Sequence, residues 1–170
     1  MTLSEIRSNR ARCLILACGN TLRGDDGVGP WLASWAEERF DGEAGVRVVS
    51  RQQWTLELAE EIAAAEAVLF VDCTVAFGAG LVCVADVQAS AHSEKIDTHQ
   101  QGASELLGMA RDLYASLPRA AMLLTVGAGS LELGEEFSAA VKAALPEACR
   151  LLDETVVRLL AYDRWSLRSL

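Results

Sequence analysis

Residues 12–29, RCLILACGNTLRGDDGVG, join a short apolar run to a glycine-rich loop that contains two adjacent aspartates. The run 12–18 is continuous and ends at Gly19, as expected of a strand buried on both faces of a parallel sheet. Val28–Phe40 has helical spacing, and Pro30 fits there because it falls in the first helical turn. This stretch therefore predicts a strand, a loop and a helix, the unit from which α/β folds are built.

Strands and helices alternate along the rest of the chain. Apolar runs predict further strands at Val46–Arg51, Ala67–Cys73, Leu81–Val87 and Ala120–Val126. Helical spacing predicts helices at Leu56–Ala65 with Thr55 as N-cap, at His99–Ser116, and at Ala139–Tyr162 with a break or kink at Pro146. This order predicts an α/β three-layer sandwich, a mostly parallel twisted sheet of about five strands with helices on both faces. The turn before the fourth strand is too short for a parallel crossover, so we expect an antiparallel edge strand there.

The bulk composition narrows the class of protein. A chain of 170 residues with 51% hydrophobic residues suits one globular domain, with residues 1–11 and 163–170 as flexible tails. The net charge of −9 argues against nucleic acid as a partner. No stretch approaches the roughly 18 apolar residues of a membrane helix. We therefore expect no membrane partner, a cytoplasmic location, and a monomer or weak oligomer.

The aspartate pair in the glycine loop is the first candidate site. The loop lacks the G-x-G-x-x-G spacing of a dinucleotide site and the lysine of a phosphate loop. Asp25 and Asp26 would also repel phosphate. Helix capping is the alternative role, because acidic residues suit a helix N-terminus.

Asp72 and His99 are the next candidates. Asp72 ends the most apolar run of the sequence. A carboxylate there is costly to bury unless it is paired or binds a metal. The alternative role for Asp72 is capping of a neighbouring loop. In a parallel sheet Asp72 would lie at the same edge as the aspartate loop. His99 opens a helix, and the residues before it span enough length to bring it back to that edge, although a lone histidine is often structural.

Two carboxylates and an imidazole suit a divalent transition metal such as nickel, zinc or manganese. His92 is the fallback imidazole, and Cys18 and Cys73 flank the site as possible soft ligands. The five cysteines form no C-x-x-C pair, which favours reduced thiols over a zinc cluster.

Three segments resemble, in order, the motifs of the [NiFe]-hydrogenase maturation endopeptidases: GNTLRGDDGVG at 19–29, VLFVDC at 68–73 and THQQGASELL at 98–107. The resemblance implies that Asp26, Asp72 and His99 bind nickel, with Asp25 beside them. It also implies that the protein removes the C-terminal extension of a hydrogenase large-subunit precursor after nickel insertion. The nickel would arrive with that precursor, and another divalent metal could occupy the site in vitro.

The resemblance also suggests roles for the carboxylates and for one loop. Asp25 or Asp26 would act as general base, in a cleavage driven either by a metal-activated water or by the carboxylate itself. Gln53 and Thr55 would contact the substrate, although the segment 51–55, RQQWT, departs from the common Gly-Gly-Thr motif.

Two other functions remain open at this stage. The same three residues would serve a non-catalytic metal-binding or metallochaperone-like domain. The glycine loop would alternatively serve a domain that binds a nucleotide or another small molecule. The sequence contains neither H-E-x-x-H nor G-x-S-x-G, the motifs of zinc proteases and of serine hydrolases.

Overall fold

The computed structural model describes residues 11–90 and 98–166, without the side chains of residues 98–101 and 162–166. A five-stranded sheet of order β2-β1-β3-β5-β4 forms its centre. The strands are β1 Cys13–Cys18, β2 Val46–Arg51, β3 Ala67–Thr74, β4 Val82–Asp86 and β5 Ala120–Gly127. The helices are the short 3-10 helix η1 Gly24–Gly27, α2 Val28–Arg39, α3 Leu58–Ala63, α4 Thr98–Tyr114 and α5 Ala139–Ser166. The α/β fold predicted from the sequence is confirmed.

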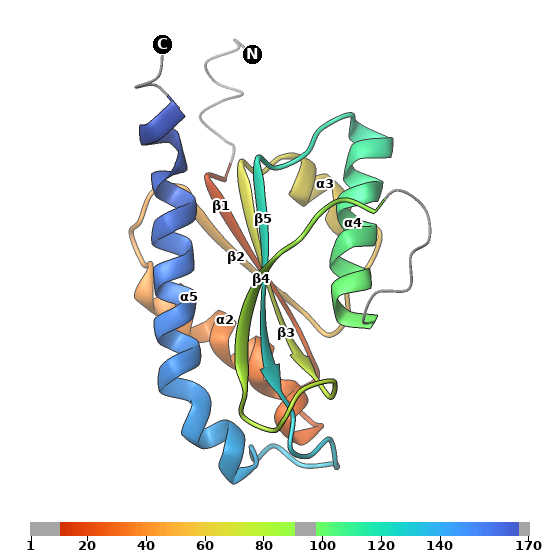
Figure 1. Ribbon diagram of the computed structural model, residues 1–170, viewed down its shortest axis with the longest axis vertical. Coiled ribbons are helices and arrows are strands. Elements are labelled where there is room, and N and C mark those ends of the chain that lie inside the picture. Colours follow the sequence, from red (N-terminus) through yellow and green to blue (C-terminus); the bar gives the residue numbers. More distant parts are fainter. Residues whose placement is uncertain (1–10, 91–97, 167–170) are drawn as a thin grey trace.

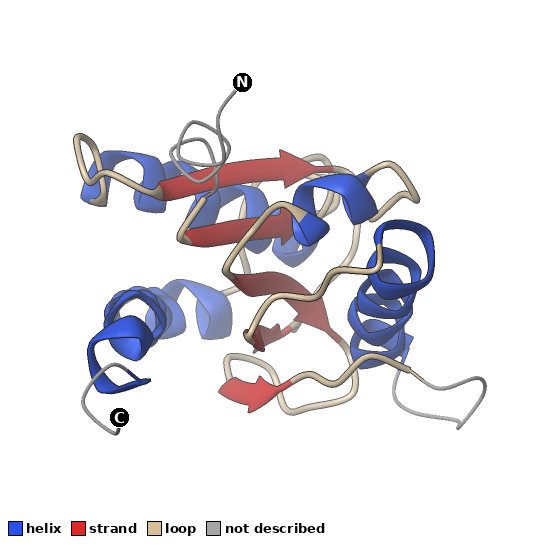
Figure 2. Cartoon of the chain, turned by 90° about the horizontal axis from the view of Figure 1, so that it is seen from above, coloured by secondary structure: helices blue, strands red, loops and turns tan. Residues whose placement is uncertain are grey.

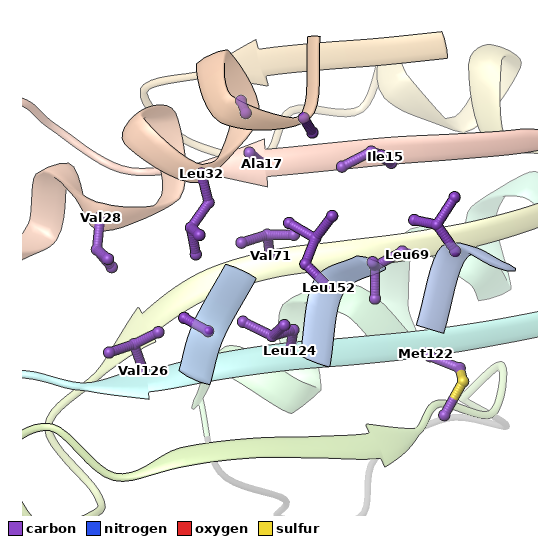
Figure 3. Packing of buried hydrophobic residues seen from close by; sticks show 14 of the residues in the cluster. Ile15, Ala17, Val28, Leu32, Leu69, Val71, Met122, Leu124, Val126 and Leu152 are labelled. Atoms are coloured by element: carbon purple, nitrogen blue, oxygen red, sulfur yellow. The ribbon is translucent and has the colours of Figure 1, made fainter. Parts of the chain in front are cut away.

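The sheet lies between two layers of helices (Figure 2). Successive residues of a strand point to opposite faces, so each buried strand supplies two cores. In β1, Ile15 packs in the cluster formed with α2 and α5, whereas Leu14 packs in the cluster formed with α3 and α4. Figure 3 shows the first cluster, in which Leu32 of α2 and Leu152 of α5 lie over the sheet. The buried residues of β1 and β3 read as continuous apolar runs for this reason.

The fourth strand is antiparallel and lies at an edge, as predicted. β4 pairs with β5, whereas β5 pairs in parallel with β3. The chain therefore leaves β3, forms the outer strand β4, and later returns with β5 to fill the place between them (Figure 1).

Three local details differ from the prediction. The helix α5 continues through Pro146, so the break that was one form of the prediction is absent, whereas a kink there stays a prediction. Helix α3 begins at Leu58 with Glu57 as its N-cap, so Thr55 lies two residues before the cap and accepts a hydrogen bond from the Leu58 N–H through its backbone oxygen at 3.1 Å. α5 also continues to Ser166, so part of the predicted C-terminal tail is helical.

Within residues 11–90 and 98–166, no helix is long and apolar enough to cross a membrane.

The four parallel strands end at one edge of the sheet, called here the carboxyl edge. Close packing of backbone fixes the loop that follows β1 there. A Cβ atom added to Gly29, in the first turn of α2, would lie 2.0 Å from the backbone oxygen of Cys18. A Cβ on Gly19, whose φ is +146°, would lie 1.9 Å from the backbone oxygen of Asp26. These two glycines let α2 begin directly against the end of β1.

Candidate functional site

Asp26 lies in η1, at the carboxyl edge, and is partly exposed. Its Oδ2 accepts a hydrogen bond from the backbone N–H of Asn20 at 2.9 Å. The side-chain Oδ1 of Asn20 in turn accepts one from the N–H of Leu22 at 2.9 Å. This pair of bonds closes the loop on itself, so the position of the Asp26 carboxylate is set by the loop between β1 and α2.

Asp25 has a different environment, because its side chain is fully buried. Its Oδ2 accepts hydrogen bonds from the N–H groups of Gly129 at 2.7 Å and Ser130 at 2.9 Å. Its Oδ1 accepts one from the N–H of Ser138 at 2.7 Å, just before α5. Burial by itself raises the pKa of Asp25, but the hydrogen bonds from Ser138, Ser130 and Gly129 outweigh it and leave the pKa below its ordinary value.

Asp25 therefore joins the loop after β1 to the loop after β5. The backbone N–H of Asp25 donates to the oxygen of Ser130 at 3.0 Å, which makes the connection reciprocal. Neither aspartate caps η1 or α2, since neither helix has a side-chain hydrogen bond at its N-cap. The capping alternative thus does not describe the helices that follow the pair. The sequence carried no signal for the contact with Ser138, which lies 113 residues away.

Asp72 lies near the end of β3, where it is buried. Its Oδ1 accepts a hydrogen bond from the N–H of Cys73 at 2.8 Å. β3 is flanked by β1 and β5, and Asp72 is in register with Thr125. The structure thus places Asp72 at the carboxyl edge, as the sequence predicts.

The charges of Asp26 and Asp72 both affect two thiols at the carboxyl edge. Burial, followed by the charges of Asp72 and Asp26, raises the pKa of Cys18 to about 12. Burial and the charges of Asp26, Asp72 and Asp25 raise the pKa of Cys73 to about 12 as well. Because such effects weaken with distance, both carboxylates lie in the neighbourhood of these thiols. Both thiols are therefore protonated at neutral pH when no metal is bound.

The first turns of α4 also lie toward this edge. A Cβ on Gly102 would lie 3.0 Å from the ring of Trp54, which belongs to the loop after β2. Trp54 packs edge-on against Phe70 of β3 at a centroid distance of 5.4 Å, two residues before Asp72. Figure 1 shows α4 starting on the side to which the parallel strands run. The backbone of His99 is in the first turn of this helix.

The predicted three-residue metal site remains a prediction. The side chain of His99 and the whole of His92 lie outside the described residues. Among the side chains that the structure describes, no three His, Cys, Asp or Glu residues are grouped closely enough to hold a metal ion. The structure thus brings two of the three predicted ligands, Asp26 and Asp72, to one edge.

Gln53 and Thr55 lie at the same edge, and both are exposed. They belong to the loop after β2, which is joined to the end of β1 by the hydrogen bond from Gly19 N–H to the oxygen of Arg51, 3.1 Å long. The thiol of Cys18 lies 3.6 Å from the backbone oxygen of Gln52. Their position allows contact with a substrate at the carboxyl edge, and that role stays a prediction.

Comparison with solved structures gives several matches over most of the chain. The hydrogenase maturating endopeptidase HybD from E. coli is 22% identical with a TM-score of 0.70, over 86% of this chain and 93% of that one. The [NiFe] hydrogenase maturation protease HybD from Thermococcus kodakarensis is 25% identical with a TM-score of 0.64, over 85% and 98%. The protease HycI from Thermococcus kodakarensis KOD1 is 22% identical with a TM-score of 0.62, over 93% and 97%. Comparison with protein-family models and with curated protein sequences gives no match.

The five-stranded sheet and the helices on its two faces define an α/β fold that the chain shares with these solved structures. The solved structures that share this fold are named hydrogenase maturation endopeptidases and proteases. The resemblance inferred from the three sequence motifs is therefore confirmed by structures that cover most of the chain.

Proposed function

We propose that this protein is an endopeptidase that removes the C-terminal extension of a [NiFe]-hydrogenase large-subunit precursor after nickel insertion. The observation that carries the proposal is the position of two carboxylates at the carboxyl edge, with Asp26 in the loop after β1 and Asp72 near the end of the neighbouring strand β3. The fold shared with named maturation proteases supports the same function. The reaction would take place in the cytoplasm, a location consistent with five cysteines that are all free thiols.

The nickel in this proposal belongs to the substrate. Carboxylate oxygens from Asp26 and Asp72, with an imidazole nitrogen from His99, form a donor set that suits a divalent transition metal. The two carboxylates have the right chemistry for that set and lie at the carboxyl edge, and His99, in the first turn of α4, would supply the imidazole. Recognition would require the metal to be seated in the precursor already.

The two neighbouring aspartates would have separate tasks. Both oxygens of Asp25 are occupied by backbone N–H groups inside the protein, so we assign it the positioning of the loop that carries Asp26. Asp26 uses one oxygen to accept the N–H of Asn20, and it is partly exposed. Asp26 is therefore the carboxylate that is placed to act on the precursor, as a ligand to its nickel or as general base.

The test is incubation of the purified protein with a nickel-loaded large-subunit precursor from the same cell, read by intact mass. The wild-type protein should release one discrete C-terminal peptide, and nickel-free precursor should stay whole. Asp26→Asn and Asp72→Asn should lose processing by at least about 100-fold, the scale expected when a ligand or general base is removed. Asp41→Asn is the matched control, because Asp41 is an exposed aspartate in the loop after α2.

Circular dichroism of each variant separates loss of chemistry from loss of the fold. Normal processing by a folded Asp26→Asn variant would refute the role of Asp26. Failure of the wild-type protein to cut any nickel-loaded precursor of its cell would refute the endopeptidase function and leave metal binding to be tested by titration.

A further inference from the structure

A cavity of about 390 Å³ lies at the end of the sheet opposite the carboxyl edge. It is lined by the end of β4, the first residues of β5, the loop that precedes β5, and part of α5. β5 begins at this cavity and reaches the level of Asp72 only at Thr125, a rise of roughly 13 Å from Ala121. The cavity is therefore separate from the candidate site, and its volume lies in the range of small-molecule sites.

The path of the chain explains why the cavity is open. At the end of β4 the N–H of Val87 donates to the oxygen of Ala121 at 2.9 Å, and the N–H of Ser90 then donates to the oxygen of Ser104 in α4 at 3.0 Å. The chain thus leaves the sheet for α4 beside the start of β5 (Figure 1). Ala120 and Ala121 line the cavity, and their small side chains leave it unfilled.

Arg158 of α5 presents a cation to this cavity. Its Nη2 lies 2.7 Å from the sulfur of Met122, and a thioether is a weak acceptor. Within residues 11–90 and 98–166, Arg158 has no ion pair, whereas the other guanidinium of the cavity, that of Arg119, pairs with Glu66 at 3.1 Å. A guanidinium has five N–H donors in a planar fork that matches a carboxylate. Arg158 is therefore the cation that is left to bind an anion.

Asp86 presents the opposite charge to the same cavity. It lies directly opposite Met122 in the β4–β5 ladder, so the two side chains project to the same face of the sheet. Figure 3 shows Met122 beside the end of β4. Asp86 also has no ion pair in the part of the chain that the structure describes, although Arg158 contacts the neighbouring methionine. A cation and an anion thus line one cavity without neutralising each other.

We propose that this cavity binds a free α-amino acid with an aliphatic side chain. The carboxylate of the ligand would lie against the guanidinium of Arg158, and its ammonium group against the carboxylate of Asp86. The aliphatic side chain would lie against the apolar part of the wall, formed by Leu117, Pro118 and Leu159. Such a ligand pairs both charges at once, which a simple anion does not.

The test is an amide NMR titration of the whole protein with L-leucine as the probe, beside two analogues that each lack one charge. 4-Methylpentanoate lacks the ammonium group, and leucinamide lacks the carboxylate. L-Leucine should bind with a Kd of about 1 mM or lower and shift the amide signals of Val87 and of residues 119–122. Each analogue should bind at least about tenfold more weakly, because it loses a charge-assisted contact.

Two variants assign the charges. Arg158→Gln should weaken the binding of L-leucine at least about tenfold and leave that of leucinamide unchanged. Asp86→Asn should weaken L-leucine to a similar degree and leave 4-methylpentanoate unchanged. Both residues are exposed, so both variants should keep the fold. Arg150→Gln is the matched control, since Arg150 is an exposed arginine of α5 outside the cavity and this variant should bind L-leucine as the wild type does.

The proposal is overturned if L-leucine causes no shifts at about ten times the expected Kd, or if the shifts lie at the carboxyl edge. Equal affinities of the three probes, or an affinity for L-leucine that both variants keep, would overturn it as well. The titration involves no cleavage, so its outcome is independent of the proposed endopeptidase function, and either can fail without the other.

Discussion

Replacing Asp25 by asparagine should destabilise the fold strongly, although it changes one atom. The asparagine oxygen can replace Oδ2 and keep the bonds from Gly129 and Ser130, but its NH₂ group would then face the N–H of Ser138, donor against donor. A buried hydrogen bond to a charged group contributes about 1.5–3 kcal/mol, and a neutral acceptor about half of that. One lost bond and two weakened ones give a decrease of about 3–6 kcal/mol in the free energy of unfolding, by the same magnitudes.

Urea unfolding at pH 7 measures this decrease from the midpoint at constant m. Asp41→Asn, at an exposed aspartate, should stay within about 0.5 kcal/mol of the wild type. A decrease below about 1 kcal/mol for Asp25→Asn would refute the reasoning, since it would show that the three bonds add little beyond a neutral side chain.

The wild-type protein and Asp25→Asn also test the ionisation of Asp25. Its folded pKa is lowered, so its charge stabilises the fold above the pKa of the unfolded chain, about 3.9. The advantage of the wild type over Asp25→Asn should be constant between about pH 5 and 7 and should shrink as the pH falls below about 4 and through the folded pKa. An advantage that stays constant to the lowest pH at which both proteins fold would contradict the assignment.

Two further changes test the fold around the site. Gly29→Ala should lower the free energy of unfolding by about 2 kcal/mol or more, because the added Cβ would lie 2.0 Å from the backbone oxygen of Cys18. The control Gly78→Ala should be nearly neutral, because a Cβ there would have no atom within 4 Å. Equal effects of the two changes in thermal unfolding would contradict the close approach of α2 to β1. Leu152→Ala should lower the free energy of unfolding, measured with urea, by about 2–5 kcal/mol, because Leu152 is fully buried between α5 and the sheet. The control Val157→Ala, on the exposed side of α5, should lower it by less than about 1 kcal/mol. A similarly small decrease for Leu152→Ala would contradict the packing of α5 on the core.

The fold was predictable because its periodicities are strong. The continuous apolar runs of β1 and β3 indicated strands buried on both faces, and the short turn after β3 indicated an antiparallel β4. The sequence did not show that β5 lies between β3 and β4, because order in a sheet depends on contacts between distant segments. The sequence also suggested a break in the last helix at Pro146, which the structure does not have. Proline removes one backbone donor, but the rest of the helix packs on the core and stays intact.

The candidate site was predicted less completely than the fold. Asp26 and Asp72 could be placed at one edge, because parallel strands end together. The partners of Asp25 could not, because Ser138 reaches it only after the whole sheet has formed. Asp25 and Asp26 cannot be told apart from the sequence. Their burial and hydrogen bonds in the structure show that Asp25 joins two loops and that Asp26 is partly exposed.

The position of β5 has a consequence for the order in which the chain can fold. β3 is buried along its whole length, yet one of its two partners is a strand that is synthesised after β4 and α4. Until β5 emerges from the ribosome, the edge of β3 opposite β1 has no partner strand, and β4 has no neighbour to pair with. Open apolar edges of this kind recruit other chains. A nascent or truncated chain that stops before Ala120 should therefore aggregate, and the last third of the sequence is needed to close the sheet on which both aspartates depend.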